Sequence, residues 1–193
     1  MNKEKITYEL QDTLVPYTRK YLNNKRILDV GCGTGLAAVY LQKKLNAKFH
    51  LLDIEDLRDK KAKNLPFVLG SADKLPFKAG EFEVAYIQFL LHHLPKKIHI
   101  LKVISEALRV ADKSVIVEEV KTARTIKKTA MAFDKKINNI LHPGSKYHFN
   151  KYYSASQIKL LMTRAHLKVD ATRVMRGNKE NGYLDTYVFI ITK

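Results

Sequence analysis

The segment from Ile27 to Gly35, which reads ILDVGCGTG, constrains the fold of this chain more than any other. A short apolar run ends in three glycines at alternate positions, Gly31, Gly33 and Gly35. This is typical of a buried strand that breaks into a tight loop before a helix, because glycine accepts positive φ and leaves its backbone open to a ligand. Asp53 ends a second apolar run about twenty residues on, a spacing that suits a carboxylate binding a ribose diol. The sequence therefore predicts an open α/β sheet that holds a nucleoside-bearing cofactor.

The spacing of the glycines discriminates between cofactors. A dinucleotide-binding turn has the pattern G-x-G-x-x-G, whereas this segment has G-x-G-x-G. Asp29 precedes the turn, and a buried carboxylate there would repel a diphosphate and favour a ligand with a positively charged amino group. S-adenosylmethionine, which carries an ammonium, a sulfonium and a ribose, is such a ligand.

On these residues the sequence resembles the class I S-adenosylmethionine-dependent methyltransferases. ILDVGCGTG is similar to the first motif of that family, and three further segments follow in the family's order. They are LLDIED at 51–56, GSADKLPF at 70–77 and EFEVAYIQFLLHHLP at 81–95. The resemblance is good from about Arg26 to Val120, and it is strongest to the small-molecule subgroup similar to enzymes of ubiquinone and menaquinone biosynthesis. It implies a Rossmann-like, doubly wound, seven-stranded sheet, mostly parallel with the last strand antiparallel.

The pattern along the chain predicts one domain of 193 residues. Strands alternating with helices indicate a parallel sheet with right-handed crossovers. The expected strands are 26–30, 48–53, 66–69, 84–88, 114–120, 167–174 and 184–192. Residues 1–24 are expected to form a helical lid whose stripe is broken near Pro16, and residues 121–165 a helical insertion that roofs the substrate.

The resemblance implies a set of cofactor-binding residues: Asp29, Gly31, Cys32, Gly33, Asp53, Ile54, Ala72, Asp73 and Gln88. Asp29 is expected to face the amino group of the cofactor, and Asp53 to accept from both ribose hydroxyls. Asp73 is expected to accept from the adenine amino group, and Gln88 to lie beside the methionine carboxylate or the sulfonium. The alternative is a helix cap or turn acid for Asp53 and an Asx-type turn for Asp73.

The candidate catalytic residues are His92 and His93, which follow the fourth strand. Their pKa range suits proton transfer near neutral pH, and a base is needed only where the nucleophile carries a proton. The alternative is that one of them packs or caps the next helix. No N/D-P-P-Y sequence follows the fourth strand, which argues against the amino-methyltransferases of adenine N6, cytosine N4 or glutamine. The histidines lack acids and cysteines at metal-ligand spacing, so no metal site is expected.

The candidate substrate-binding residues are Glu119, His148 and Tyr152. Strand alternation places either Glu118 or Glu119 in the pocket. The aromatic segment around His148 and Tyr152 is expected to shape the pocket, and the alternative for it is a packed loop.

The formal net charge of +16 has two interpretations. It fits a polyanionic partner such as RNA, and it fits a lysine-rich composition with solvated lysine pairs. The single cysteine, Cys32, cannot form an internal disulfide, which favours the cytoplasm. No secretory signal or membrane-length apolar run is visible. The sequence therefore predicts a cytoplasmic methyltransferase with a small-molecule acceptor. An RNA or protein methyltransferase and a non-enzymatic S-adenosylmethionine-binding protein are the alternatives, and the oligomeric state stays open.

Overall fold

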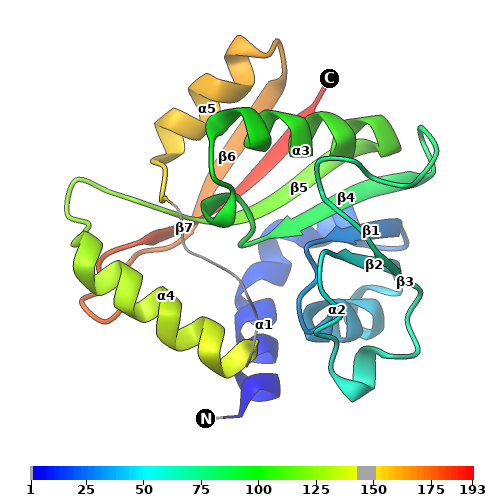
Figure 1. Cartoon of the computed structure of the whole chain (residues 1–193), viewed down its shortest axis with the longest axis horizontal. Coiled ribbons are helices and arrows are strands. Elements are labelled where there is room, and N and C mark those ends of the chain that lie inside the picture. The colour runs from blue at the N-terminus through cyan, green and yellow to red at the C-terminus, as the bar shows by residue number, and fades with distance from the viewer. Residues whose placement is uncertain (1, 143–150) are drawn as a thin grey trace.

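A seven-stranded sheet with helices on both faces forms the body of the chain (Figure 1). The computed structural model describes residues 2–142 and 151–193. The strands are β1 (Arg26–Val30), β2 (Lys48–Asp53), β3 (Phe67–Leu69), β4 (Phe82–Gln88), β5 (Ala111–Val120), β6 (Lys168–Met175) and β7 (Asp185–Thr192). Their order is β3-β2-β1-β4-β5-β7-β6. The first five strands pair in parallel, whereas β7 runs antiparallel between β5 and β6. This confirms the fold class that the sequence predicts.

Helices cover the sheet in two layers because its central strands are apolar on both faces. The helices are α1 (Lys3–Leu22), α2 (Leu36–Leu45), α3 (Lys97–Val110), α4 (Lys127–Leu141) and α5 (Ala155–Arg164), with short 3-10 turns η1 (Lys60–Ala62) and η2 (Leu91–His93). On β5, Val115 belongs to the core under α1 and α2, and the next residue, Ile116, belongs to the core under α3 and α5. This alternation follows from the two-residue period of a strand.

Helix α1 differs from the sequence pattern, which is broken near Pro16. Helix α1 runs without a break through Pro16, which is exposed, so the backbone carbonyl that the proline leaves without a helical partner can face water. Between β2 and β3 the chain forms only the 3-10 turn η1. Helix α4 begins at Lys127, after a turn in which the Thr125 hydroxyl accepts from the Thr122 N–H at 2.7 Å. Helix α5 begins with a capping box at Ser154.

Helix α4 stands away from the two helix layers, and its C-terminal end approaches α1 (Figure 1). Its N-terminal end is held by the loop between β6 and β7, where the Ile126 N–H donates to the carbonyl of Gly182 at 3.0 Å. Gly182 packs so closely that an added Cβ would lie 2.5 Å from the Ala130 nitrogen. Among residues 2–142 and 151–193, no helix is both long enough and apolar enough to cross a membrane.

Candidate active site

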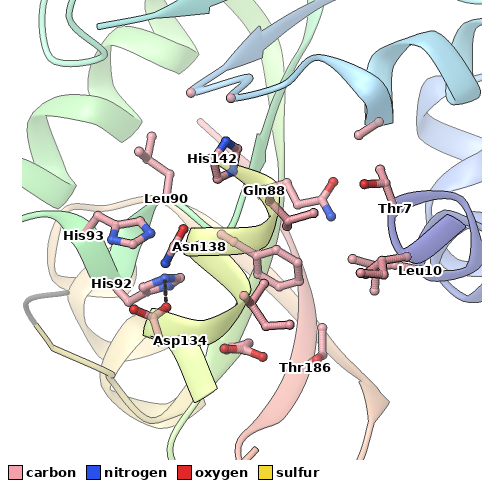
Figure 2. Close-up of a pocket in the computed structure, with 18 of the residues that line it drawn as sticks. Thr7, Leu10, Gln88, Leu90, His92, His93, Asp134, Asn138, His142 and Thr186 are labelled. Atoms are coloured by element: carbon pink, nitrogen blue, oxygen red, sulfur yellow. Dashed lines mark ion pairs between the residues drawn. The ribbon is translucent and has the colours of Figure 1, made fainter. Parts of the chain in front are cut away.

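A cavity of about 380 Å³ lies between the glycine loop, α1 and α4. The end of β4 and the following η2 turn form its floor, with Gln88 and His92 among the lining residues. Figure 2 shows Thr7 and Leu10 of α1 on one side of the cavity and Asp134 and Asn138 of α4 on the other. The cavity thus lies where ligands bind in open α/β sheets, at the carboxyl ends of the strands.

The glycine loop after β1 takes the conformation that its sequence predicts. Gly31, Gly33 and Gly35 have φ values of 74°, 53° and 69°, in the left-handed region that favours glycine. Hydrogen bonds to β2 hold this path: the Gly31 N–H donates to the carbonyl of Leu52 and the Gly33 N–H to the Asp53 carboxylate, both at 2.8 Å. Asp53 therefore holds the loop in place from the end of β2, and it is not itself among the residues that line the cavity.

Asp29 is a buried acid that lines the cavity next to the glycine loop, with 3% of its surface exposed. Burial raises the pKa of Asp29 to about 8, and the nearby Asp53 adds to the rise. A cationic group placed beside Asp29 would restore its ionisation. The carboxyl group is therefore suited to bind an ammonium.

Gln88 ends β4 in the cavity and is oriented by α1. Its side-chain oxygen accepts from the Gln11 amide at 3.1 Å and from the Tyr86 hydroxyl at 3.0 Å. With the oxygen occupied in this way, the amide nitrogen of Gln88 is the group left to donate toward a ligand. Helix α1 is thereby connected to the floor of the site.

His92 lies between two carboxylates. Its Nδ1–H donates to Glu118 at 2.5 Å, and its Nε2 lies 3.3 Å from a carboxylate oxygen of Asp134 on α4. Burial alone would lower the pKa of His92, but Glu118 and Asp134 together raise it to about 10, so the ring is an imidazolium at neutral pH. Burial likewise opposes the ionisation of Asp134, and the hydrogen bond from His92 overcomes this and lowers its pKa. The pair joins α4 to the η2 turn.

Of the two adjacent glutamates of β5, Glu119 lines the cavity, whereas Glu118 points toward η2. Burial raises the pKa of Glu119 to about 7, partly opposed by the charge of His92. The Tyr152 hydroxyl donates to Glu119 at 3.5 Å, and the Tyr152 ring lies 5.2 Å from that of His92 between centroids. His93 lines the cavity beside His92, at a ring separation of 4.1 Å.

His142, directly after α4, lies against the glycine loop (Figure 2). A Cβ added to Gly33 would lie only 2.2 Å from Cε1 of the His142 ring. Burial lowers the pKa of His142, although the charge of Asp53 opposes the effect. The His142 imidazole therefore fills the space above Gly33, where the sequence predicts that a ligand binds.

The structure brings together the residues predicted to bind the methionine part of the cofactor and those predicted to be catalytic. The residues predicted to bind the adenine are not among those that line the cavity. Ile54 is 63% exposed, and Asp73 accepts from the Ser71 hydroxyl at 2.7 Å in the turn that also contains Ala72. These three residues keep their cofactor roles as predictions. His148 lies outside the described residues.

The sequence predicts a helical roof in residues 121–165, but it does not identify which residues of α4 line the cavity, or that His142 directly after it does. These residues are Phe133, Asp134, Ile137, Asn138, Leu141 and His142. They fall in two series with a spacing of four, which is the signature of one helix face. Asp134 also stands alone among lysines in the sequence. Both signals are visible in the sequence, but neither tells which way the face points.

The parallel sheet with an antiparallel β7, the glycine loop and the acid at the end of β2 define an α/β protein built for a nucleoside-bearing cofactor. Residues 27–113 match a family model described as a methyltransferase domain. This match spans the glycine loop and the strands from β1 to the start of β5, and over that part the chain is similar to S-adenosylmethionine-dependent methyltransferases.

The similar proteins are methyltransferases of several kinds. Demethylmenaquinone methyltransferase of Lactococcus lactis is 28% identical over 108 residues, which covers 50% of this chain but only 43% of that relative. A methyltransferase structure from Methanosarcina mazei has a TM-score of 0.68 at 20% identity, covering 92% of this chain and 97% of that one. Geranyl diphosphate C-methyltransferase of Streptomyces coelicolor, solved with Mg²⁺, geranyl diphosphate and S-adenosylhomocysteine, has a TM-score of 0.67 at 12% identity and covers 98% and 83%. These two structures share the fold.

Proposed function

We propose that this chain transfers a methyl group from S-adenosylmethionine to a small-molecule acceptor. The observation that carries the proposal is the cavity of about 380 Å³, which runs from the glycine loop to His92, His93 and Glu119. Its volume is in the range of pockets that enclose small ligands, roughly 300–1,000 Å³. The menaquinone-pathway relative supports an acceptor of this class.

The residues around the glycine loop fit the cofactor. Gly31 and Gly33 let the backbone approach it, and Asp29 offers a buried carboxylate for its ammonium. Asp53 is the proposed ribose acceptor, and Gln88 presents its amide nitrogen near the methionine portion. When bound, S-adenosylmethionine supplies an electrophilic methyl group on a positively charged sulfur.

The protein's own contribution is alignment of the acceptor with that methyl group, which can lower a barrier by about 7–11 kcal/mol at best. His93 and Glu119 are the proposed acceptor contacts, because both line the cavity at its far end. His92 already directs both ring nitrogens at carboxylates, so its proposed role is to hold η2 and α4 around the acceptor. Proton removal, where the acceptor needs it, would use His93 or Glu119.

We propose that residues 1–24 act as a lid and residues 121–165 as a roof. The Gln11–Gln88 hydrogen bond connects α1 to the cofactor end, and the His92–Asp134 ion pair connects α4 to the acceptor end. Both helices must stay in place to exclude water from the reacting groups. The apolar lining residues Leu10, Phe133 and Ile137 support this role.

A nucleic-acid acceptor is the second candidate, favoured by the basic outer face of α4. Lys127, Lys128, Lys135 and Lys136 are all exposed on the helix that borders the cavity. Such a face would attract a phosphate backbone through counterion release. Transfer to RNA would therefore depend on these lysines, whereas transfer to a small molecule would not.

The experiment that separates the two candidates is methyl transfer from isotopically labelled S-adenosylmethionine into fractions of a cell extract. We expect label in the small-molecule fraction, with none in RNA or protein. Label confined to RNA, and lost when the four α4 lysines are changed to glutamine, would establish the second candidate. Cofactor binding without label in any fraction would contradict both and indicate a binding protein.

Cofactor affinity is expected to rise with pH between about 6 and 8, by up to tenfold per pH unit. The pKa of Asp29 is about 8 in the chain without ligand, so an ammonium that binds its ionised form must displace a proton. The groups that face Asp29 are Asp53, Tyr86 and Cys32, and the pKa values of Tyr86 and Cys32 are raised out of this window. Calorimetry with S-adenosylhomocysteine in two buffers of different ionisation enthalpy measures the proton release. An Asp29→Asn variant should lose it, and equal affinity at pH 6 and 8 in the wild-type chain would contradict the assignment.

Replacing His142 with alanine is expected to tighten cofactor binding by roughly three- to tenfold. The ring lies above Gly33, and its displacement is a conformational cost that binding must meet. Calorimetric Kd values for S-adenosylhomocysteine check this. His166→Asn, which removes an exposed imidazole at φ 58°, is the matched control and should leave the Kd unchanged. Weaker binding by the His142→Ala variant would mean that the ring contacts the cofactor instead.

A further inference from the structure

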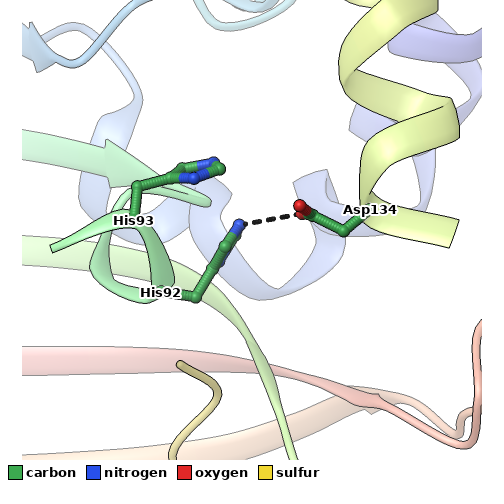
Figure 3. A group of neighbouring side chains, drawn as sticks. All are labelled: His92, His93 and Asp134. Carbon is green, nitrogen blue, oxygen red and sulfur yellow. Dashed lines mark ion pairs between the residues drawn. The ribbon is translucent and has the colours of Figure 1, made fainter. Parts of the chain in front are cut away.

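We propose that His92, His93 and Asp134 form a binding site for a divalent transition-metal cation of the zinc class. Each residue offers one ligand atom, and these atoms all lie within 4.8 Å of one another. Figure 3 shows both imidazole rings extending from η2 toward the carboxylate that α4 contributes. The three side chains border the cavity and are not on the outer surface.

The separation of the ligand atoms suits a metal ion between them. Nε2 of His92 lies 3.3 Å from the nearer carboxylate oxygen of Asp134. Two ligand atoms that each lie about 2.0–2.1 Å from a tetrahedral zinc ion are about 3.3 Å apart. The ligand atom of His93 lies within 4.8 Å of the other two.

The next layer of contacts is that of a metal-binding histidine. Glu118 accepts from Nδ1 of His92 at 2.5 Å, which directs Nε2 toward the site, where the metal ion would replace the proton that the ring carries in the absence of metal. Glu118 is itself fixed by the N–H groups of Leu91 at 2.7 Å and Glu119 at 2.9 Å. A carboxylate that orients a metal-bound imidazole is the usual support of such ligands and raises their affinity. A histidine that only packs a helix does not require this arrangement.

The donor set identifies the class of metal. Two imidazole nitrogens and one carboxylate oxygen suit zinc or another first-row transition metal, whereas magnesium and calcium prefer oxygen ligands alone. Three protein ligands leave at least one coordination position, and Asn138 and Glu119 line the cavity next to it. The role of this position rests on the proposed function: it would hold an oxygen atom of the methyl acceptor and lower the pKa of the acceptor's hydroxyl group. The proposal differs from the sequence-based expectation of no metal site, because the third ligand comes from α4, which is distant from the histidines in the sequence.

The test uses the untagged full-length chain, first dialysed against a chelator. Titration with Co²⁺ should give one equivalent of saturable binding with the visible absorption of a nitrogen- and oxygen-coordinated ion, and Zn²⁺ should displace it. His93→Gln and Asp134→Asn should each weaken Zn²⁺ binding by roughly tenfold or more. His166→Asn is the matched control and should not change it, because His166 is exposed on the turn between α5 and β6.

Absence of saturable Co²⁺ binding by the wild-type chain would overturn the proposal, whatever the variants do. Equal weakening of Zn²⁺ binding by His93→Gln, Asp134→Asn and His166→Asn would overturn it as well. So would unchanged Zn²⁺ binding by both His93→Gln and Asp134→Asn. Circular dichroism and the Kd for S-adenosylhomocysteine, measured on the same samples, establish that each variant is folded. Because metal binding is read without methyl transfer, Zn²⁺ binding by a chain that labels no acceptor would contradict the proposed function and leave the metal site standing.

Discussion

Replacing Glu118 with alanine will lower the free energy of unfolding by about 3–5 kcal/mol, the range for removing one partner of a buried ion pair. Glu118 is 1% exposed and accepts from the His92 ring and from the N–H groups of Leu91 and Glu119. Without it, a buried imidazolium and two backbone donors lose their acceptor, and each unsatisfied group carries a desolvation cost. Denaturant unfolding followed by circular dichroism measures the change.

Two further variants define what Glu118 contributes. Glu118→Gln keeps an acceptor oxygen but removes the charge, so its loss of stability should be smaller. Glu180→Ala changes an exposed glutamate in the β6–β7 loop and should stay within about 0.5 kcal/mol of the wild-type chain. A loss below about 1 kcal/mol for Glu118→Ala would show that the η2 turn does not depend on this carboxylate.

Replacing Asp53 with alanine is expected to weaken binding of S-adenosylmethionine and S-adenosylhomocysteine by about 1–3 kcal/mol, or roughly 5- to 150-fold. The carboxylate is 1% exposed and accepts from the Gly33 N–H at 2.8 Å and the Glu55 N–H at 3.2 Å. We expect it to accept from the ribose hydroxyls as well. Its removal would therefore take away contacts with the ligand and release the glycine loop. Isothermal calorimetry measures the combined change in binding free energy.

The control for Asp53 is Asp56→Ala, three residues along the chain. Asp56 pairs at the surface with Arg58 at 2.9 Å and Lys63 at 2.8 Å, so its loss should leave the cofactor Kd unchanged. An unchanged Kd for a folded Asp53→Ala variant would remove Asp53 from the site. Equal weakening by both substitutions would point to a general disturbance of the segment after β2.

The fold and the conformation of the glycine loop could be predicted from the sequence because their signals are local. Each strand up to β5 is marked by its own apolar run, and the glycine loop by its own spacing. Asp29 and Asp53 are found for the same reason, since both lie at the carboxyl ends of their strands. That α1 continues through Pro16 could not be predicted. A helix tolerates an internal proline more easily on its solvent-facing side, and the sequence does not tell which side of the helix that is.

The contacts of α4 with the rest of the cavity lining were decided by the tertiary structure. The ion pair between His92 and Asp134 joins a turn after β4 to a helix after β5, and no periodicity within either segment indicates it. His142 reaches Gly33 in the same way, across more than half of the chain. The sequence by itself determined the sheet and the loop that approach the cofactor, because strand alternation and glycine φ are properties of neighbouring residues. Only the folded chain decided how α4 docks, because that depends on burying charged groups from distant segments against one another.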